Sequence, residues 1–583
     1  MVSDRRWWSR SMLASVDRLT IMTFLFAAVG GVVVLRLALL QTLVTTRSLG
    51  DQADQRQRLQ ALLPRRGEIA IVDDHAKRET PIAFGQTIST VFAVPNEIEQ
   101  KQEVAKELSA MLHLDEKEIA QKLERTESQF VPFAKRLPPE TVDAIKAHKW
   151  KGIYFQDAPG RVYPDGALLS QVSGFVRTQD NGEMTGQYGI EEFFNKELTG
   201  HSGWEHLLRD GTGRLIPLPG SNSEKAQNGL TIVLTIDRTV QFQVCSALER
   251  KVAAFQASGG SAVVMNPRTG EIRALCNVPS FDPNKYADVK NIRDFSNAAI
   301  IEAYEPGSVM KIFTMAAGIE YGEVTPETTF VDTGSLTFGP FTIRNAADKV
   351  YGLQTMVGVL KDSINTGAVF VAQKVGSERF RSFLERLEFG APTGVELPNE
   401  QGGSLRSLRQ PGAIYTATAS FGQGISVTLI QLARALSAVA NGGTLISPTI
   451  IKEFRTPSGL VLTPPIQKRS TVMSRTTSTL ISGMMAQVVE EGHSKGAAVP
   501  GYYIAGKTGT AQVAIPGQRG YSGKYNHTFM GFGPVENPQF LIVVRIVNPK
   551  ALYAESTAVP VAGEIEKFLI SYDRIPPTRT IGQ

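Results

Sequence analysis

Ser308 and Lys311 are the residues whose types and spacing most clearly suggest chemistry. A three-residue spacing places both side chains on one face of a helix, and Pro306 and Gly307 interrupt the chain just before the serine. The residues after Lys311 are almost all apolar, which predicts a buried helix with Ser308 near its amino end. There, free backbone N–H groups would stabilise an oxyanion, and burial would lower the pKa of the lysine towards a neutral, proton-accepting amine. The pattern predicts a serine nucleophile with a lysine base; a solvent-exposed lysine on an ordinary helix is the alternative without chemistry.

Two later motifs supply partners for this pair. Ser363 and Asn365 are separated by one residue in a segment that we expect to form a loop at the same cleft. Lys507 opens the sequence Lys-Thr-Gly-Thr on a predicted strand. Each motif alone is short and common, but serine-x-x-lysine, serine-x-asparagine and lysine-threonine-glycine in this order are typical of penicillin-binding proteins and serine β-lactamases.

On these motifs the chain resembles the class B, monofunctional penicillin-binding proteins, in particular the septal type often called penicillin-binding protein 3 or FtsI. The resemblance covers nearly the whole chain. Beyond the three motifs, it is carried by the segments Arg66–Ile69, Arg161–Pro164, Gly189–Glu191, Leu234–Asp237, Pro279–Asn284 and Phe421–Gly424. One departure lies at Asp73–Ala76, where Asp-Asp-His-Ala stands in place of the Asp-Arg-x-Gly turn usual in the family.

The resemblance implies a role for each residue of the first two motifs. Ser308 would be the nucleophile and Lys311 its general base. Ser363 would relay a proton towards the leaving amine. Asn365 would hold the substrate amide and the lysine.

The third motif would bind the substrate. Lys507 would supply positive charge near the substrate carboxylate, and the hydroxyl groups of Thr508 and Thr510 would donate hydrogen bonds to it. Gly509 would let the strand backbone approach closely. The backbone N–H groups of Ser308 and Thr510 would form the oxyanion hole.

The substrate and the fold also follow from the resemblance. The implied donor is a peptidoglycan stem peptide ending in D-Ala-D-Ala, which would acylate Ser308 with loss of D-alanine before an amine of a neighbouring stem peptide forms the cross-link. β-Lactams would mimic this donor. The implied catalytic fold is the penicillin-recognising, serine β-lactamase-like fold. No metal or organic cofactor is implied, and the seven histidines show no ligand spacing.

The composition describes a globular chain with more than one core. Of its 583 residues 42% are hydrophobic, and the formal charge of +5 comes from 61 basic and 56 acidic residues without basic runs, which argues against nucleic-acid binding. Cys245 is expected in a helix and Cys276 in a strand. We interpret both as buried thiols, with a single bridge as the alternative if the two elements touch in an oxidising compartment.

An apolar stretch over residues 19–44 predicts a single transmembrane anchor. Residues 19–35 carry no charge, and the apolar character resumes after Arg36, which is enough to span a bilayer with some tilt. Four arginines precede the stretch, so the positive-inside tendency places residues 1–18 in the cytoplasm and the catalytic part outside the inner membrane. A cleaved signal peptide is the alternative, because residues 28–30 have a small-x-small pattern.

Residues 45–225 are expected to form a non-catalytic α+β pedestal of the kind called a dimerisation domain. Two amphipathic stretches, Glu97–His113 and Glu116–Arg125, predict solvated helices between short strands, and breaker residues at 217–222 mark the boundary. The transpeptidase domain is expected over residues 226–575, followed by a tail at 576–583. In the related family the pedestal holds the catalytic domain away from the membrane and contacts partners.

The catalytic domain is expected to be an antiparallel sheet covered by helices, with a helical lobe over residues 297–489. A strand at 231–236, a helix at 238–255 and a hairpin around residues 266–270 open it. Later strands at 503–511, 528–533 and 540–547 are expected to pair with these first strands.

The sequence alone leaves several hypotheses about the function open. A β-lactam sensor would need a cytoplasmic domain, for which eighteen residues are too few. A β-lactamase would add a glutamate four residues before an asparagine, whereas Glu396 precedes Asn399 by three. A carboxypeptidase would differ only in accepting water. By resemblance, the partners would be a SEDS-type glycan polymerase (FtsW-like) and other divisome proteins, with a role in elongation as the alternative to division.

Overall fold

A computed structural model gives the structure of the chain and describes residues 22–39, 57–73, 78–179, 183–209, 215–217, 223–464, 467–515 and 520–580. The chain forms two compact units. The first comprises Met1–Pro64 and His201–Gln227, and the second comprises Arg65–Gly200 and Asn228–Gln583.

The first unit contains a helix and a small sheet. The helix Met22–Leu39 has 18 residues with a mean hydropathy of 2.2, and its side chains are exposed. Its length and composition suffice to cross a bilayer, as the sequence predicted; residues 1–21 and 40–44 of that prediction lie outside the described residues. The sheet is antiparallel in the order β1 (Gln57–Leu62), β8 (Gly203–Arg209) and β9 (Leu215–Pro217).

A seven-stranded sheet in the second unit carries the predicted α+β module. Its strands are β19 (Val461–Leu462), β18 (Ile451–Arg455), β10 (Thr231–Leu234), β2 (Ile69–Asp73), β3 (Arg78–Ala93) and β4 (Val131–Leu137) in this order, with β5 (Ile153–Val162) pairing with β3. The amphipathic helices α2 (Lys101–Leu112) and α3 (Glu116–Leu123) bury Leu108 and Ile119 in the same apolar cluster as Val91 of β3.

The strand at 231–236 is placed differently from our prediction. We expected it to pair with the catalytic strands, but β10 pairs in parallel with β2 and antiparallel with β18. A run of apolar residues predicts a buried strand but does not specify which sheet the strand joins, because that choice depends on contacts distant in sequence.

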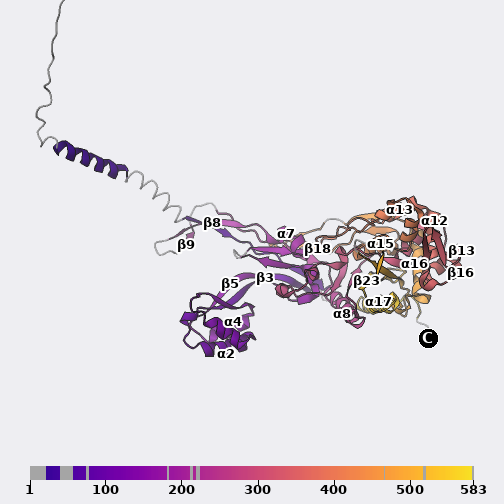
Figure 1. Ribbon diagram of the computed structural model, residues 1–583, viewed down its shortest axis with the longest axis horizontal. Helices are drawn as coiled ribbons and strands as arrows, with labels where there is room; N and C mark the ends of the chain where they lie inside the picture. The colour runs from indigo at the N-terminus through magenta and orange to yellow at the C-terminus, as the bar shows by residue number, and fades with distance from the viewer. Residues whose placement is uncertain are drawn as a thin grey trace, which may run out of the picture. The chain divides into compact units, whose positions relative to one another are not determined.

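The catalytic part contains an antiparallel sheet, as the sequence predicted. Its five strands lie in the order β12 (Ile272–Val278), β11 (Gly259–Met265), β23 (Phe540–Val547), β22 (Tyr521–Gly533) and β21 (Ala505–Ala514). Successive residues of β11 pack in two different hydrophobic clusters. Val264 packs in one cluster with α8 (Arg238–Ala254) and α17 (Ala558–Tyr572), whereas Val263 packs in another with α15 (Leu429–Ala440). Helices therefore cover both faces, and Figure 1 shows α8 and α17 beside the strands that include β23.

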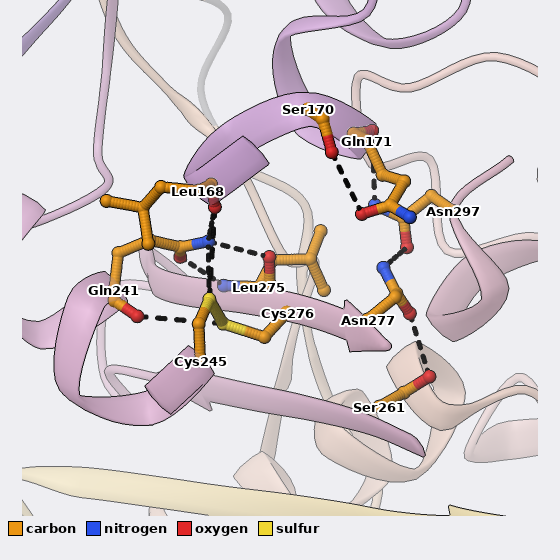
Figure 2. Close-up of a disulfide and its surroundings, with 10 residues drawn as sticks. All are labelled: Leu168, Ser170, Gln171, Gln241, Cys245, Ser261, Leu275, Cys276, Asn277 and Asn297. Atoms are coloured by element: carbon orange, nitrogen blue, oxygen red, sulfur yellow. Dashed lines mark hydrogen bonds between the residues drawn. A yellow bond between two sulfur atoms is a disulfide. The ribbon is translucent and has the colours of Figure 1, made fainter. Parts of the chain in front are cut away.

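Cys245 and Cys276 form a disulfide, so our preferred interpretation of two free buried thiols was wrong (Figure 2). Both elements were predicted correctly, since Cys245 lies in α8 and Cys276 in β12. Packing of α8 on β12 brings the two Cα atoms to 5.4 Å, a contact that no local pattern reveals. Beside the bridge, the side-chain amide of Gln241 donates hydrogen bonds to the carbonyls of Leu168 and Leu275 (Figure 2).

Three segments that carry the family resemblance meet in one buried ion cluster. Glu191, with no exposed surface, accepts a hydrogen bond from Arg161 Nε at 2.7 Å and another from Arg66 Nε at 2.7 Å. Burial by itself would raise the pKa of Glu191, but the charges and hydrogen bonds of Arg161 and Arg66 outweigh it and hold the pKa below its usual value.

We expect Glu191→Gln to destabilise the protein by about 3–5 kcal/mol at pH 7, because it leaves two buried guanidinium groups without their carboxylate. Since the folded-state pKa of Glu191 is lowered, its contribution is present above the unfolded pKa of about 4.3 and is lost as the pH falls through the folded pKa. Thermal melting at several pH values checks this, with the exposed Glu197→Gln as control. Equal melting temperatures for the two variants at pH 7 would contradict it.

Candidate active site

Ser308 lies at the start of a helix that is almost entirely buried. It belongs to the 3-10 turn Gly307–Met310, which runs directly into α10 (Lys311–Glu320). Eight of the ten residues of α10 are buried, whereas Ser308 is half-buried. The predicted helix is thus confirmed, and its first turn presents the serine hydroxyl at the edge of the core.

Lys311 is buried, with 1% of its surface exposed, and its amine contacts residues of both the first and the second motif. Nζ lies 3.1 Å from Ser308 Oγ, 3.2 Å from Ser363 Oγ and 2.7 Å from Asn365 Oδ1, and it also donates to the carbonyl of Ser363. Burial, assisted by the charge of Lys507, lowers the pKa of Lys311 well below its usual range.

The partners of this amine suit its neutral form. The carbonyl of Ser363 and Oδ1 of Asn365 can only accept hydrogen bonds, so together they use the two N–H groups of a neutral amine. The nitrogen lone pair is then left to accept the proton of Ser308. The geometry therefore allows Lys311 to act as a base towards this hydroxyl.

Ser363 stands between the two lysines of the site. Its Oγ lies 3.2 Å from Lys311 Nζ and 3.0 Å from Lys507 Nζ, and its backbone has a φ of +58°. A hydroxyl can both donate and accept, so Ser363 can pass a proton between groups on either side. Asn365 is not in a loop, as we expected, but is the first residue of α12 (Asn365–Val375).

Lys507 lies on β21, which is an edge strand of the five-stranded sheet. It has no exposed surface, and burial lowers its pKa to about 7. Thr508 is buried and Thr510 half-buried, and Oγ1 of Thr510 accepts a hydrogen bond from the backbone N–H of Ala554 at 3.2 Å. An edge strand leaves backbone groups free for an extended peptide.

Close backbone contacts hold the nucleophile turn against this strand. A Cβ atom added at Gly509 would lie 2.8 Å from the carbonyl oxygen of Pro306, so a larger residue would push the strand and the turn apart. On the other side, the N–H of Gly307 donates to the carbonyl of Gly422, whose φ is +81°. The motif Phe421–Gly424 gave a family resemblance in the sequence, but this packing role was not predicted.

Glu305 is a polar group of the site that sequence reasoning missed. It precedes the nucleophile turn, and its carboxylate accepts hydrogen bonds from Gly424 N at 2.9 Å and from the hydroxyl of Tyr521 at 3.2 Å. Burial raises the pKa of Glu305. It ties the strand β22 and the loop at Gly424 to the turn that carries Ser308.

Glu396, whose sequence position comes nearest to that of a hydrolytic glutamate, forms hydrogen bonds with Thr449 and Ile450. Its carboxylate accepts hydrogen bonds from Thr449 Oγ1 at 2.9 Å and from Ile450 N at 3.0 Å. Among the residues that the structure describes, no three His, Cys, Asp or Glu side chains come together as metal ligands.

The chain matches two family models. The model of the penicillin-binding protein transpeptidase domain matches residues 260–567, and that of the penicillin-binding protein dimerisation domain matches residues 61–234.

Known proteins are similar over most of their length. Stage V sporulation protein D of Bacillus subtilis is 33% identical over 86% of this chain and 77% of its own. The probable peptidoglycan D,D-transpeptidase PenA of Neisseria gonorrhoeae is 31% identical over 98% and 95%, respectively. The peptidoglycan D,D-transpeptidase FtsI of Buchnera aphidicola is 30% identical over 95% and 94%.

A solved structure shows the same likeness. Penicillin-binding protein 3 of Mycobacterium tuberculosis, in complex with aztreonam, superimposes with a TM-score of 0.69 at 27% identity, over 90% of this chain and 99% of that one.

Proposed function

The chain belongs to the penicillin-binding proteins that join a dimerisation domain to a transpeptidase domain, and from this premise we propose that it cross-links peptidoglycan as a D,D-transpeptidase with Ser308 as its nucleophile. The observation that carries the proposal is the contact of Ser308 Oγ with the buried amine of Lys311 at 3.1 Å. Two acceptor-only groups engage N–H groups of this amine, which in its neutral form leaves the lone pair available for a hydroxyl proton.

Acylation of Ser308 would proceed as follows. Oγ attacks the carbonyl carbon between the two terminal D-alanines of the donor while Lys311 takes the hydroxyl proton. The backbone N–H groups of Ser308 and Thr510 stabilise the oxyanion, and each such donor typically contributes about 3 kcal/mol to the transition state. The peptide bond then breaks, and the proton passes through Ser363 to the amine of the departing D-alanine.

The third motif would hold the carboxylate end of the donor. Burial lowers the pKa of Lys507 to about 7, and an arriving carboxylate would favour its protonated form. The hydroxyl groups of Thr508 and Thr510 would donate hydrogen bonds to the same carboxylate. An amine of a second stem peptide then attacks the ester, which gives the cross-link and frees Ser308. A β-lactam enters in place of the donor and keeps its leaving group tethered.

We expect the acyl-enzyme formed with benzylpenicillin to persist well beyond minutes, because a hydrolytic water would lack the roughly 10²- to 10⁴-fold that general-base catalysis supplies. Purified protein is acylated, freed of excess drug and followed by intact mass. Glu396→Gln should leave the adduct lifetime unchanged, since Glu396 is bound to Thr449 and Ile450. Release within seconds would favour a hydrolase, and a longer lifetime in the variant would identify Glu396 as the base.

The helix Met22–Leu39 supports placement in the inner membrane, and we propose that residues 1–18 are cytoplasmic and the catalytic part lies outside. Disulfides persist in extracytoplasmic compartments, so the bridge between Cys245 and Cys276 supports this orientation. In living cells a membrane-permeant maleimide should leave both cysteines unlabelled unless a reductant is added. Labelling without reductant would contradict the outward orientation.

We further propose a septal role beside a SEDS-type glycan polymerase and other divisome proteins, supported by the similarity to FtsI. The proposed domain limits are 45–225 for the pedestal, 226–575 for the transpeptidase domain and 576–583 for a tail.

A truncated, exported chain beginning at Ser48 should still be acylated by penicillin yet fail to support division, because it lacks the span that would contact the polymerase. Normal division with this truncated chain alone would refute a partner contact through the span.

A further inference from the structure

We propose that Asp332 is a positioning residue for the acylation of Ser308, because it fixes the amide group that caps the helix of Asn365. This inference rests on the proposed function. Asp332 ends β13 (Thr329–Asp332) and belongs to none of the three motifs, and only 2% of its surface is exposed.

The carboxylate of Asp332 is held by four neutral donors. Oδ1 accepts from Gly334 N at 2.9 Å and from Thr366 Oγ1 at 2.6 Å. Oδ2 accepts from Asn345 Nδ2 at 2.9 Å and from Tyr351 N at 2.8 Å. Burial favours the neutral acid, but these four hydrogen bonds prevail, and the pKa of Asp332 is lowered. The group is therefore an ionised acceptor at neutral pH.

An ionised carboxylate determines which way the Asn345 amide faces. A carboxylate cannot donate, so the NH₂ group of Asn345 must point towards Asp332, and it also donates to the carbonyl of Lys349 at 3.0 Å. Oδ1 of Asn345 then faces α12. There it accepts from the backbone N–H groups of Asn365 at 3.0 Å and Thr366 at 3.2 Å.

This contact replaces a helix cap that the local sequence lacks. The N-cap position of α12 is Ile364, whose apolar side chain makes no cap hydrogen bond, so the first N–H groups of the helix need an acceptor from elsewhere. Asn345 supplies it from twenty residues earlier in the chain. The cap holds the backbone of Asn365, whose Oδ1 accepts from Lys311 Nζ at 2.7 Å. A chain of direct contacts thus runs from Asp332 through Asn345 and Asn365 to the amine beside Ser308.

Replacing Asp332 by asparagine should disturb this chain without removing bulk. Oδ1 of the new amide can accept hydrogen bonds from Gly334 N and Thr366 Oγ1. Its NH₂ group would then face the NH₂ group of Asn345. In this orientation the new NH₂ group also faces the backbone N–H of Tyr351, and in the opposite orientation it faces the backbone N–H of Gly334. If Asn345 turns its own amide over to relieve the clash, it points a donor at the N–H groups of α12 and abolishes the cap.

The test uses the full-length protein in detergent and stopped-flow acylation by nitrocefin, with the binding constant and the acylation rate constant measured separately. We expect Asp332→Asn to lower the acylation rate constant by about 10- to 100-fold through misplacement of Asn365, with the binding constant changed less than threefold. Asp348→Asn is the matched control, since this exposed carboxylate on the same connection pairs with exposed Arg344. It should acylate at the wild-type rate.

A swapped pair separates positioning from general destabilisation. In the double variant Asp332→Asn/Asn345→Asp, the new carboxylate at 345 can accept both from the amide at 332 and from the N–H groups of α12, although it can no longer donate to the carbonyl of Lys349. The acylation rate constant should recover at least fivefold over that of Asp332→Asn. Recovery in the double variant would support the inference, and a wild-type rate constant in Asp332→Asn would overturn it.

Two further variants keep the test decisive. Should Asp332→Asn unfold at the assay temperature, Asn345→Ala removes the cap directly and is expected to slow acylation by the same 10- to 100-fold; a wild-type rate constant there would also overturn the inference. Ser308→Ala separates the proposed transpeptidase function from the proposed role of Asp332. If it still forms the covalent adduct, the proposed function fails; if it does not and Asp332→Asn acylates normally, only the role of Asp332 fails.

Discussion

Ser308→Ala should form no covalent adduct with penicillin, because the substitution removes the hydroxyl oxygen that contacts the buried amine of Lys311 from the nucleophile turn and that we assign to the attack on the carbonyl. Ser308 is half-buried and forms no part of the packed face of α10, so the fold should persist. Intact mass after exposure to benzylpenicillin is the measurement. The melting temperature should stay within a few degrees of wild type.

Ser363→Ala is the matched comparison for this variant. It removes a hydroxyl that lies equally close to Lys311, but one that we assign to proton relay. Labelling should be slower and should still go to completion at Ser308. Stoichiometric labelling of Ser308→Ala would falsify the assignment of the nucleophile, and peptide mapping would then locate the true one.

Lys311→Met should slow acylation by about 10²- to 10⁴-fold, since a serine hydroxyl without a base is a poor nucleophile. Methionine keeps the apolar stem, which limits the cavity. Acylation of the wild type should fall as the pH drops through the folded-state pKa of Lys311, because protonation fills the lone pair that Ser308 needs. Burial and the charge of Lys507 place that pKa well below the usual lysine value, so the rate should reach its plateau at a lower pH than an ordinary lysine base would allow.

The same lowered pKa predicts that Lys311 costs stability. Between the folded-state pKa and the unfolded value of about 10.4, the unfolded chain binds a proton that the folded chain does not, so stability falls as the pH falls within this window. Lys311→Met removes this cost. At pH 7 the variant should melt at or above the wild-type temperature while reacting far more slowly. A normal acylation rate would show that another group is the base, and a large loss of stability would show that the amine is mainly structural.

Local patterns in the sequence determined much of the architecture. The apolar run after Lys311 predicted a buried helix, the stretch at residues 19–44 predicted a helix able to span a membrane, and short apolar runs bounded by turn residues predicted β11 and β23. These predictions were correct because the pattern of apolar residues in a helix or a strand reflects the burial of that single element. The three motifs could be recognised as a set for the same reason, since each is a short stretch with its own chemistry.

Contacts between distant segments were decided only by the tertiary structure. Ser363 and Lys507 lie 144 residues apart in sequence, yet their side chains meet at 3.0 Å, and the pKa of each buried lysine depends on that enclosure. The disulfide and the sheet that takes β10 likewise depend on which elements pack together. Asp332 shows the limit most clearly. An aspartate at the end of a strand has no distinctive local signal, and its importance arises only because folding places Asn345 between its carboxylate and the uncapped end of α12.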